Sequence, residues 1–249
     1  MTRTAIVTGA TSGIGRAAAV ALSEAGWWVL VGGRDEERGR EVATELGTRS
    51  GGEFLPGDLT QDETAQRLVE RAVEATGRLD TVVYSAGTHF LATVEETVPK
   101  EYDRLIDTNL RGAVLLARAA IPAMRHSGGG VVVNVSSEAG LVAVPGQVAY
   151  NVSKAGLLML TKSIAADHSK DGIRAVSVCP GTTRTPLVER AIQSAPDPEA
   201  HERWLASSRP ANRLGTPEEI AAAIVFAVSD EAGYLTGSEI VIDGGYTAV

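Results

Sequence analysis

Short apolar runs rich in β-branched residues alternate with amphipathic helical stretches along the whole chain. The runs are apolar on both faces, as in parallel strands that helices cover from either side. The predicted strands span residues 4–8, 28–32, 53–57, 80–85, 131–136, 174–179 and 239–243. The predicted helices span residues 13–25, 35–47, 61–76, 101–126 and 217–229, with one more helix that carries Tyr150. Strand–helix alternation at this spacing is typical of βαβ units with right-handed crossovers.

This order of elements predicts an α/β fold of Rossmann type: a doubly wound, parallel, seven-stranded sheet flanked by helices on both faces. We expect residues 1–249 to form a single dinucleotide-binding domain. The pattern leaves one long irregular segment, residues 181–215, which contains four prolines. A loop of that length inside a compact domain is usually functional, so we expect residues 186–213 to form a substrate lid.

Charge and composition narrow the class of partner. The 249 residues carry a net charge of −8, which argues against nucleic acid as the main partner. No apolar run approaches the length of a membrane-spanning helix, so we expect no membrane partner. Apolar residues begin almost at once in "TAIVTGA", from which we expect no secretory leader. The single cysteine, Cys179, is compatible with a reducing cytoplasm, and we expect no metal site.

A glycine-rich turn, "TGATSGIG", directly follows the first predicted strand and opens the first helix. Gly9, Gly13 and Gly15 would let the backbone approach a pyrophosphate, and Ser12 lies at the N-terminus of the helix. The spacing differs from GxGxxG, but the mechanics are the same. A tight strand–helix turn without a ligand is the alternative; the position on the first βαβ unit favours a dinucleotide.

The end of the second strand should meet the adenosine ribose of that dinucleotide. An acidic residue there would bind the 2′-hydroxyl of NAD, but the sequence has Gly33, followed by Arg34 and Asp35. Arg34 favours NADP(H), and NAD(H) stays the alternative because Asp35 offsets the charge. Otherwise Arg34 is a solvated loop charge and Asp35 a helix N-cap. In "GDL", Asp58 and Leu59 are expected near the adenine, and a turn or N-cap aspartate is the alternative for Asp58.

Catalytic chemistry is indicated by "NVSSEAG" and "YNVSK". Ser137 lies at the carboxyl edge of the fifth strand, and Tyr150 and Lys154 share one helix face at i and i+4. We expect the Lys154 ammonium to lower the pKa of the Tyr150 phenol, which would then exchange a proton with an alcohol or carbonyl. The alternative is a tyrosine that caps the core beside a snorkelling lysine.

Together with "DTNLRG", "PGTTRT" and "YLTGSEIVIDGG", these motifs make the chain resemble a short-chain dehydrogenase/reductase over essentially its whole length. The resemblance implies that Tyr150 is the acid/base, that Ser137 binds the substrate oxygen, and that Lys154 holds the nicotinamide ribose. It also implies that Asn109 kinks a helix and positions a water next to Lys154. A polar residue tolerated inside a long helix is the alternative for Asn109.

The same resemblance extends to further cofactor contacts. It implies that Ile14 packs beside the cofactor. It implies that the turn beside the nicotinamide contacts the cofactor through Pro180, Gly181, Thr183 and Thr185. It also implies that Ala86 and Gly87, after the fourth strand, allow the cofactor to approach closely. Turn and capping chemistry is the alternative for the two threonines. The chain departs from the family's Asn-Ala-Gly in having Ser85, which must replace the hydrogen bonds of the asparagine. Family members are mostly homotetramers or dimers, so we expect one of these assemblies.

The substrate pocket should be lined by His89 and Phe90, by residues 140–147 and by the lid. The lid carries several arginines that could bind a carboxylate or polyhydroxy substrate, but we expect most to be solvated or to make subunit contacts: Arg184, Arg190, Arg203, Arg209 and Arg213. Cys179 is expected to be a core residue at a strand end.

These observations predict an oxidoreductase that transfers a hydride between NADP(H), or NAD(H), and a small-molecule secondary alcohol or ketone. One alternative is a non-catalytic dinucleotide-binding regulator, which would be expected to lack one of Ser137, Tyr150 or Lys154. Another is an epimerase or dehydratase of the extended branch. Members of that branch have a turn similar to GxxGxxG and a larger C-terminal substrate domain. This chain has GxxxGxG at the turn, and its last predicted strand lies close to its last residue.

Overall fold

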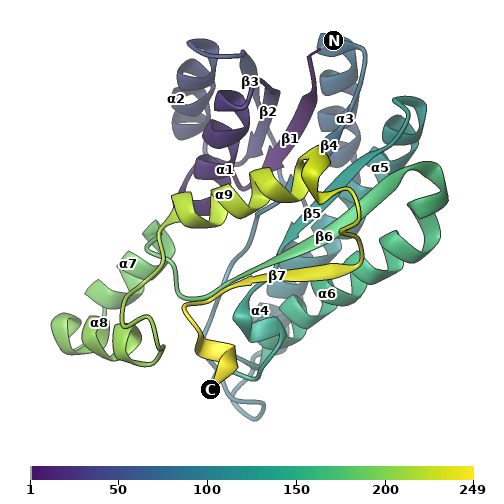
Figure 1. The fold of residues 1–249 in the computed structure, drawn as a ribbon. Helices are drawn as coiled ribbons and strands as arrows, with labels where there is room; N and C mark the ends of the chain where they lie inside the picture. Colours follow the sequence, from purple (N-terminus) through teal and green to yellow (C-terminus); the bar gives the residue numbers. More distant parts are fainter. Residues whose placement is uncertain (1) are drawn as a thin grey trace.

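The computed structural model describes residues 2–249, whose seven strands form one parallel sheet in the order β3-β2-β1-β4-β5-β6-β7 (Figure 1). The strands are β1 Thr4–Thr8, β2 Trp28–Gly33, β3 Gly52–Pro56, β4 Thr81–Tyr84, β5 Gly130–Val135, β6 Ile173–Pro180 and β7 Ser238–Ile242. Each lies within one residue of its predicted bounds, and the predicted fold class is confirmed. The order reverses between β1 and β4, which is the switch point where such sheets bind ligands.

Helices cover both faces of this sheet (Figure 1). On one face lie α1 Gly13–Glu24, α2 Glu36–Gly47 and α9 Pro217–Val228. On the other lie α3 Asp62–Thr76, α5 Gly112–His126 and α6 Val148–His168, and α4 Pro99–Ile106 packs against α6. Within residues 2–249 we find no helix that is both long and apolar enough to span a bilayer.

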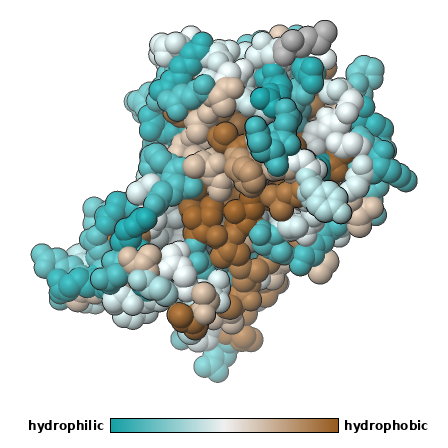
Figure 2. Space-filling model, viewed as in Figure 1, coloured by the Kyte–Doolittle hydropathy of each residue, from teal (hydrophilic) through white to brown (hydrophobic). Residues whose placement is uncertain are grey.

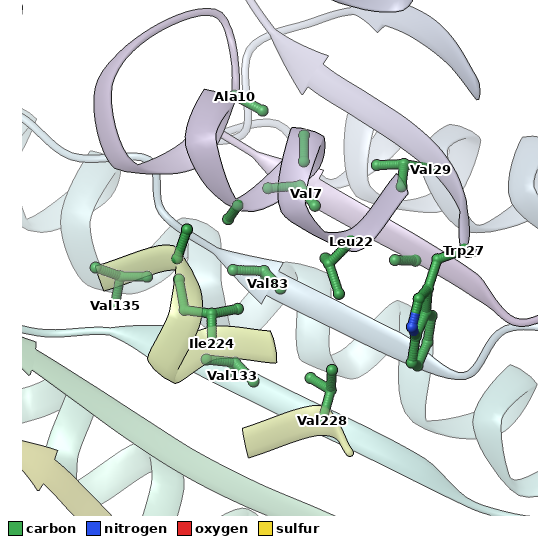
Figure 3. Close-up of a cluster of buried hydrophobic side chains, with 14 of the residues drawn as sticks. Val7, Ala10, Leu22, Trp27, Val29, Val83, Val133, Val135, Ile224 and Val228 are labelled. Carbon is green, nitrogen blue, oxygen red and sulfur yellow. The ribbon is translucent and has the colours of Figure 1, made fainter. Parts of the chain in front are cut away.

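Two apolar clusters, one on each face, hold the layers together because alternate residues of each strand point to opposite faces. In β1, Ala5 and Val7 face the first cluster and Ile6 faces the second, and all three are fully buried. Figure 3 shows Leu22 of α1 and Ile224 of α9 beside the strand residues of the first cluster. Burying these aliphatic side chains stabilises the sheet edge that carries the site, by about 1.5–3 kcal/mol each.

The expectation that residues 181–215 are irregular is wrong. This segment contains two helices, α7 Pro186–Gln193 and α8 Pro198–Ser207. Each begins with proline at its first position, where the missing N–H costs nothing. Thr185 and Asp197 cap them, because their side chains accept from Val188 N and Ala200 N. The prolines that suggested a loop are therefore helix-start signals.

The predicted helix over 101–126 is also divided. A π-helical turn over Asp107–Arg111 separates α4 from α5 and contains Asn109. Such turns often mark functional sites, because the wider ring redirects a side chain.

Candidate active site

The predicted functional segments meet at one edge of the sheet. The glycine-rich turn follows β1, the segment Ser85–Gly87 follows β4, Ser137 follows β5 and Gly181 follows β6. Because all these strands run parallel, their carboxyl ends share that edge.

The glycine-rich turn requires glycine at its first position. Gly9 has φ +63°, and a Cβ there would lie 2.6 Å from the backbone of Ala86. The turn therefore lies directly against the segment after β4. Helix α1 starts at Gly13, and the N-cap Ser12 makes no side-chain hydrogen bond to its first turn. The N–H groups of that turn can bind an anion such as a pyrophosphate.

A cleft of about 410 Å³ opens beside this turn, between α1, α2 and the starts of α7 and α9. Ser12 and Gly13 line it, together with Arg16 of α1 and Arg38 of α2, which we did not predict. Both arginines pair with acids, Arg16 with Glu45 at 2.7 Å and Arg38 with Asp35 at 3.0 Å. Their signal in the sequence is a basic residue in the first turn of each of two consecutive helices. Ile14 packs partly buried against the first core cluster, so its core role is observed.

The residues expected to choose between NADP and NAD lie at the end of β2. A Cβ at Gly33 would lie 2.8 Å from Thr11 Cγ2, so a larger side chain would displace Thr11. Asp35 caps α2 by accepting from Arg38 N at 3.1 Å and also pairs with the Arg38 guanidinium. Arg34 is exposed and forms no hydrogen bond or ion pair with any residue of the described chain. Arg34 is thus the available cation at this strand end.

After β3, Asp58 is a surface residue and Leu59 is a core residue. Asp58 is exposed, and its carboxylate accepts from Thr60 N and Thr60 Oγ1 at 3.0 and 2.9 Å. Leu59 is 8% exposed and belongs to the second core cluster. The turn interpretation of Asp58 is therefore observed, and contact with an adenine stays a prediction for both residues.

Tyr150 and Lys154 lie one turn apart on α6 and converge. The Lys154 Nζ atom is 5.5 Å from the centroid of the Tyr150 ring and donates to the carbonyl of Val135 at 2.8 Å. Lys154 is 5% exposed. Ser136 Oγ donates to the Lys154 carbonyl at 2.8 Å and so ties the end of β5 to α6. These bonds place the ammonium beside the carboxyl end of β5.

Ser137 completes this cluster. Its Oγ atom accepts from Ala139 N at 3.1 Å, which caps the short 3₁₀ turn Glu138–Gly140. A hydrogen bond with Ser137 also lowers the pKa of Tyr150. Ser137, Tyr150 and Lys154 are therefore brought together as predicted, although their roles stay predictions.

The expected depression of the Tyr150 pKa by Lys154 is wrong for this structure. Burial raises the pKa of Tyr150 to about 12, in spite of the hydrogen bond with Ser137. Burial likewise lowers the pKa of Lys154 to about 8. Loss of hydration disfavours the charged form of each group, and it is the largest cause of both pKa shifts.

Asn109 is fully buried and holds the segment after β4. Its Oδ1 accepts from Thr88 N at 2.7 Å, and its Nδ2 donates to Thr88 O at 2.9 Å and Ser153 Oγ at 3.1 Å. The interpretation of Asn109 as a residue merely tolerated in a helix is therefore incomplete, because it joins three segments. Positioning of a water by Asn109 stays a prediction.

The neighbouring Ser85–Ala86–Gly87 segment approaches both the turn and the lysine. A Cβ at Gly87 would lie 3.6 Å from Asn109 Oδ1 and 3.8 Å from Lys154 Nζ. The Ser85 side chain makes no hydrogen bond with any other described residue, so it does not replace the bonds expected of an asparagine.

The residues after β6 form a hydrogen-bonded turn. Pro180 ends β6, and Gly181 N donates to Ile242 O at 2.9 Å. Thr183 is 4% exposed, and its hydroxyl donates to Gly181 O at 2.9 Å. Thr185 caps α7 and would contact a Cβ placed on Gly13 at 3.2 Å. The turn role of Thr183 and the capping role of Thr185 are observed, and contact of either residue with a cofactor stays a prediction.

On the substrate side, the His89 ring meets the Tyr150 ring edge-on, with centroids 5.1 Å apart and planes at 84°. Burial lowers the pKa of His89, and a hydrogen bond with Gln147 opposes this shift. The bond between Ala92 N and Gly146 O, at 2.8 Å, brings the two segments together. His89 thus packs against the Tyr150 ring and is held by Gln147, and Phe90 is partly buried.

Most arginines between residues 184 and 213 are exposed, and three of them form surface ion pairs: Arg184 with Glu189 and Glu202, Arg203 with Glu199, and Arg213 with Glu219. Arg209 is the exception at 4% exposed. Its side chain meets Glu138, a buried acid that we did not predict and whose pKa burial raises to about 7. Cys179 is a fully buried free thiol in β6, which confirms the core interpretation.

Comparison with known proteins gives matches along the full chain. A family model described as enoyl-(acyl carrier protein) reductase matches residues 9–247. The chain is similar to an uncharacterized oxidoreductase of Thermotoga maritima, with 46% identity over 98% of this chain and 97% of the relative. It is also similar to a 3beta-hydroxysteroid dehydrogenase of Mediterraneibacter gnavus, with 37% identity over 97% and 94%. The crystal structure of gox2181 superposes with a TM-score of 0.93 at 31% identity, over 100% of this chain and 96% of that one.

The buried amide of Asn109 leads to a stability prediction. Replacing Asn109 by alanine leaves the Thr88 backbone groups unpaired, so we expect the free energy of unfolding to fall by about 1–3 kcal/mol. Urea unfolding followed by circular dichroism measures this change. Thr108→Ala is the matched control, because among residues 2–249 its hydroxyl bonds only the Arg104 carbonyl and the change should stay within about 0.5 kcal/mol. An Asn109→Ala variant as stable as the unaltered chain would contradict the assignment.

Proposed function

Because the chain belongs to the short-chain dehydrogenase/reductase family, we propose that it transfers a hydride between a nicotinamide dinucleotide and a secondary alcohol or ketone. The observation that carries this proposal is the convergence of Ser137, Tyr150 and Lys154 beside the glycine-rich turn. The bound dinucleotide supplies the hydride acceptor or donor. The residues of this chain bind it, orient the substrate and move the proton.

Tyr150 is the proposed acid/base. With a pKa of about 12, the phenol is neutral near pH 7 and is the form that donates a proton to the oxygen of a ketone. In alcohol oxidation the phenol must first lose its proton, so rising pH favours that direction. Ser137 bonds the same substrate oxygen and orients it toward the phenol.

Lys154 is the proposed ribose-binding residue. An ammonium has three donors, and Lys154 gives one of them to the Val135 carbonyl. The Nζ atom also lies close to Gly87, which has no side chain to block its approach. The remaining donors can bond ribose hydroxyls, and this contact would favour the charged form of the lysine.

We propose NADP(H) as the preferred dinucleotide. Asp35 is engaged by Arg38 and by the start of α2, whereas Arg34 is exposed and unpaired among residues 2–249. Gly33 leaves no acid at the strand end to bind a ribose 2′-hydroxyl. A 2′-phosphate would therefore meet a cation at this position and no free carboxylate.

For the substrate, we propose a small secondary alcohol or ketone held between Tyr150, the His89–Gln147 pair and the lid, residues 186–213. The Mediterraneibacter gnavus relative is named for a hydroxysteroid, which is a secondary alcohol. A non-catalytic regulator would not require three converging proton-transfer side chains, so the geometry favours an enzyme. The lone buried thiol, Cys179, agrees with a cytoplasmic location.

The proposed acid/base role of Tyr150 can be tested by substitution. Replacing Tyr150 by phenylalanine removes the proton donor, so we expect turnover to fall by about 10²–10⁴-fold while the dinucleotide still binds. The measurement is a screen of ketones and alcohols with both dinucleotides, following absorbance of the reduced nicotinamide. Tyr234→Phe is the control, because Tyr234 is fully exposed. Unchanged turnover in Tyr150→Phe would remove the assignment.

The second prediction concerns the dinucleotide. Arg34→Ala removes a charged hydrogen bond to the 2′-phosphate, so kcat/KM for NADPH should fall about ten- to a hundredfold, with little change for NADH. Arg40→Ala is the control, because Arg40 pairs with Glu36 on the exposed side of α2. Equal kcat/KM values for NADPH and NADH in the unaltered enzyme would contradict the proposed preference for NADP(H).

The third prediction concerns assembly. Apolar side chains gather over α9 and β7 (Figure 2), including the half-exposed Phe226 and Val241, and β7 is an edge strand of the sheet. A second exposed apolar group on α5 and α6 comprises Val114, Val152 and Met159. Two separate self-complementary faces build a tetramer with dihedral symmetry. Light scattering should give the mass of a tetramer, and Met159→Glu should reduce it to a dimer, whereas a monomeric unaltered chain would contradict this assembly.

A further inference from the structure

A buried ion pair connects the catalytic loop to the lid. Arg209 and Glu138 approach to 3.3 Å, with side chains 3% and 9% exposed. Among the ion pairs of residues 2–249, this is the one in which both side chains are less than a tenth exposed. The two residues are 71 positions apart in the chain, so their pairing depends on the tertiary fold.

Each partner belongs to a segment that matters for the proposed reaction. Glu138 directly follows Ser137 and opens the 3₁₀ turn that the Ser137 hydroxyl caps. Arg209 follows α8 after its C-cap, Ser208, and lies near the end of the lid. Its guanidinium also donates to the Leu205 carbonyl in α8 and to Thr182 Oγ1, at 2.9 Å, in the loop after β6. One side chain therefore contacts the lid, the loop beside Gly181 and the catalytic turn.

The surroundings leave these two side chains little freedom. A Cβ at Gly181 would lie 2.8 Å from Glu138 Oε2, and a Cβ at Gly244 would lie 3.3 Å from Arg209 Cδ. The Tyr246 ring lies 5.4 Å from the guanidinium carbon. The nearby acid Asp243 is already occupied, because it accepts from Gly245 N, Thr247 N and Thr247 Oγ1. Glu138 is therefore the acid that pairs with Arg209.

The pair is poorly optimised for stability. Glu138 Oε2 and Arg209 Nε are buried and have no hydrogen-bond partner within the described chain. Burying an incompletely bonded ion pair is often less stable than an apolar pair of similar volume. A role in fixing geometry explains the pair better than a contribution to stability.

We propose that Arg209 is a positioning residue that acts through Glu138 on Ser137. The buried pair holds the Ser137–Gly140 turn against the lid, so that the Ser137 hydroxyl stays directed toward the substrate oxygen when the lid covers the substrate. This inference rests on the proposed function for the role of Ser137, but the mechanical link between lid and turn does not.

Hydrogen exchange of the full-length protein tests that link without a substrate. In Arg209→Met, peptides covering residues 137–142 and 198–208 should both exchange about tenfold faster or more, as expected for loss of a hydrogen bond to a charged group. Arg203→Met is the matched control, because Arg203 is in the same lid but pairs with Glu199 on the surface. Faster exchange in the lid alone, or in neither segment, would overturn the inference.

Kinetics then separate positioning from stability. With a ketone that the unaltered enzyme reduces, Arg209→Met should raise the KM for the ketone about tenfold and leave the KM for the dinucleotide unchanged. The double variant Glu138→Met/Arg209→Met should regain thermal stability but keep the high KM. A KM that recovers together with stability would show a merely structural pair. If the unaltered enzyme reduces no ketone, the proposed function is wrong. The hydrogen-exchange experiment still tests whether Arg209 connects the lid to the Ser137–Gly140 turn.

Discussion

The parallel direction of all seven strands is the constraint on which the site depends. Parallel strands place every carboxyl end at one edge, so segments that lie far apart in the sequence meet there. Because β1 and β4 are neighbours at the reversal of strand order, Gly9 lies against Ala86. The core clusters on both faces keep these strands in register, which fixes the distance from the glycine-rich turn to Ser137 and Lys154.

Burial then determines the charge state of the catalytic pair. Lys154 is buried and Tyr150 is partly buried, and each shifts toward its neutral form. The Val135 carbonyl bonds the ammonium and partly compensates for its lost hydration. This balance keeps the phenol neutral near pH 7, which is the form that the proposed proton donor requires. The buried Glu138 adds a charge that raises the pKa of the same phenol, and Arg209 compensates for that charge.

Much of this could be predicted from local pattern, and the remainder depends on distant contacts. Strand bounds were predictable because buried parallel strands are continuous apolar runs, and Tyr150 and Lys154 because i and i+4 share a helix face. Helices α7 and α8 were missed because proline reads as a helix breaker unless the residue before it is recognised as a cap, as with Thr185 and Asp197. The pKa of Tyr150 and the Glu138–Arg209 pair depend on burial and on a contact across 71 residues, which no local pattern encodes.

The central claim is that the Tyr150 hydroxyl exchanges a proton with the substrate oxygen while Ser137 orients that oxygen. The most direct measurement is a crystal structure of the ternary complex with oxidised dinucleotide and a secondary alcohol. We expect the alcohol oxygen within hydrogen-bond distance of both Tyr150 Oη and Ser137 Oγ, with the carbinol carbon facing the nicotinamide. An alcohol oxygen bonded by other side chains, with the phenol directed away from it, would contradict the account.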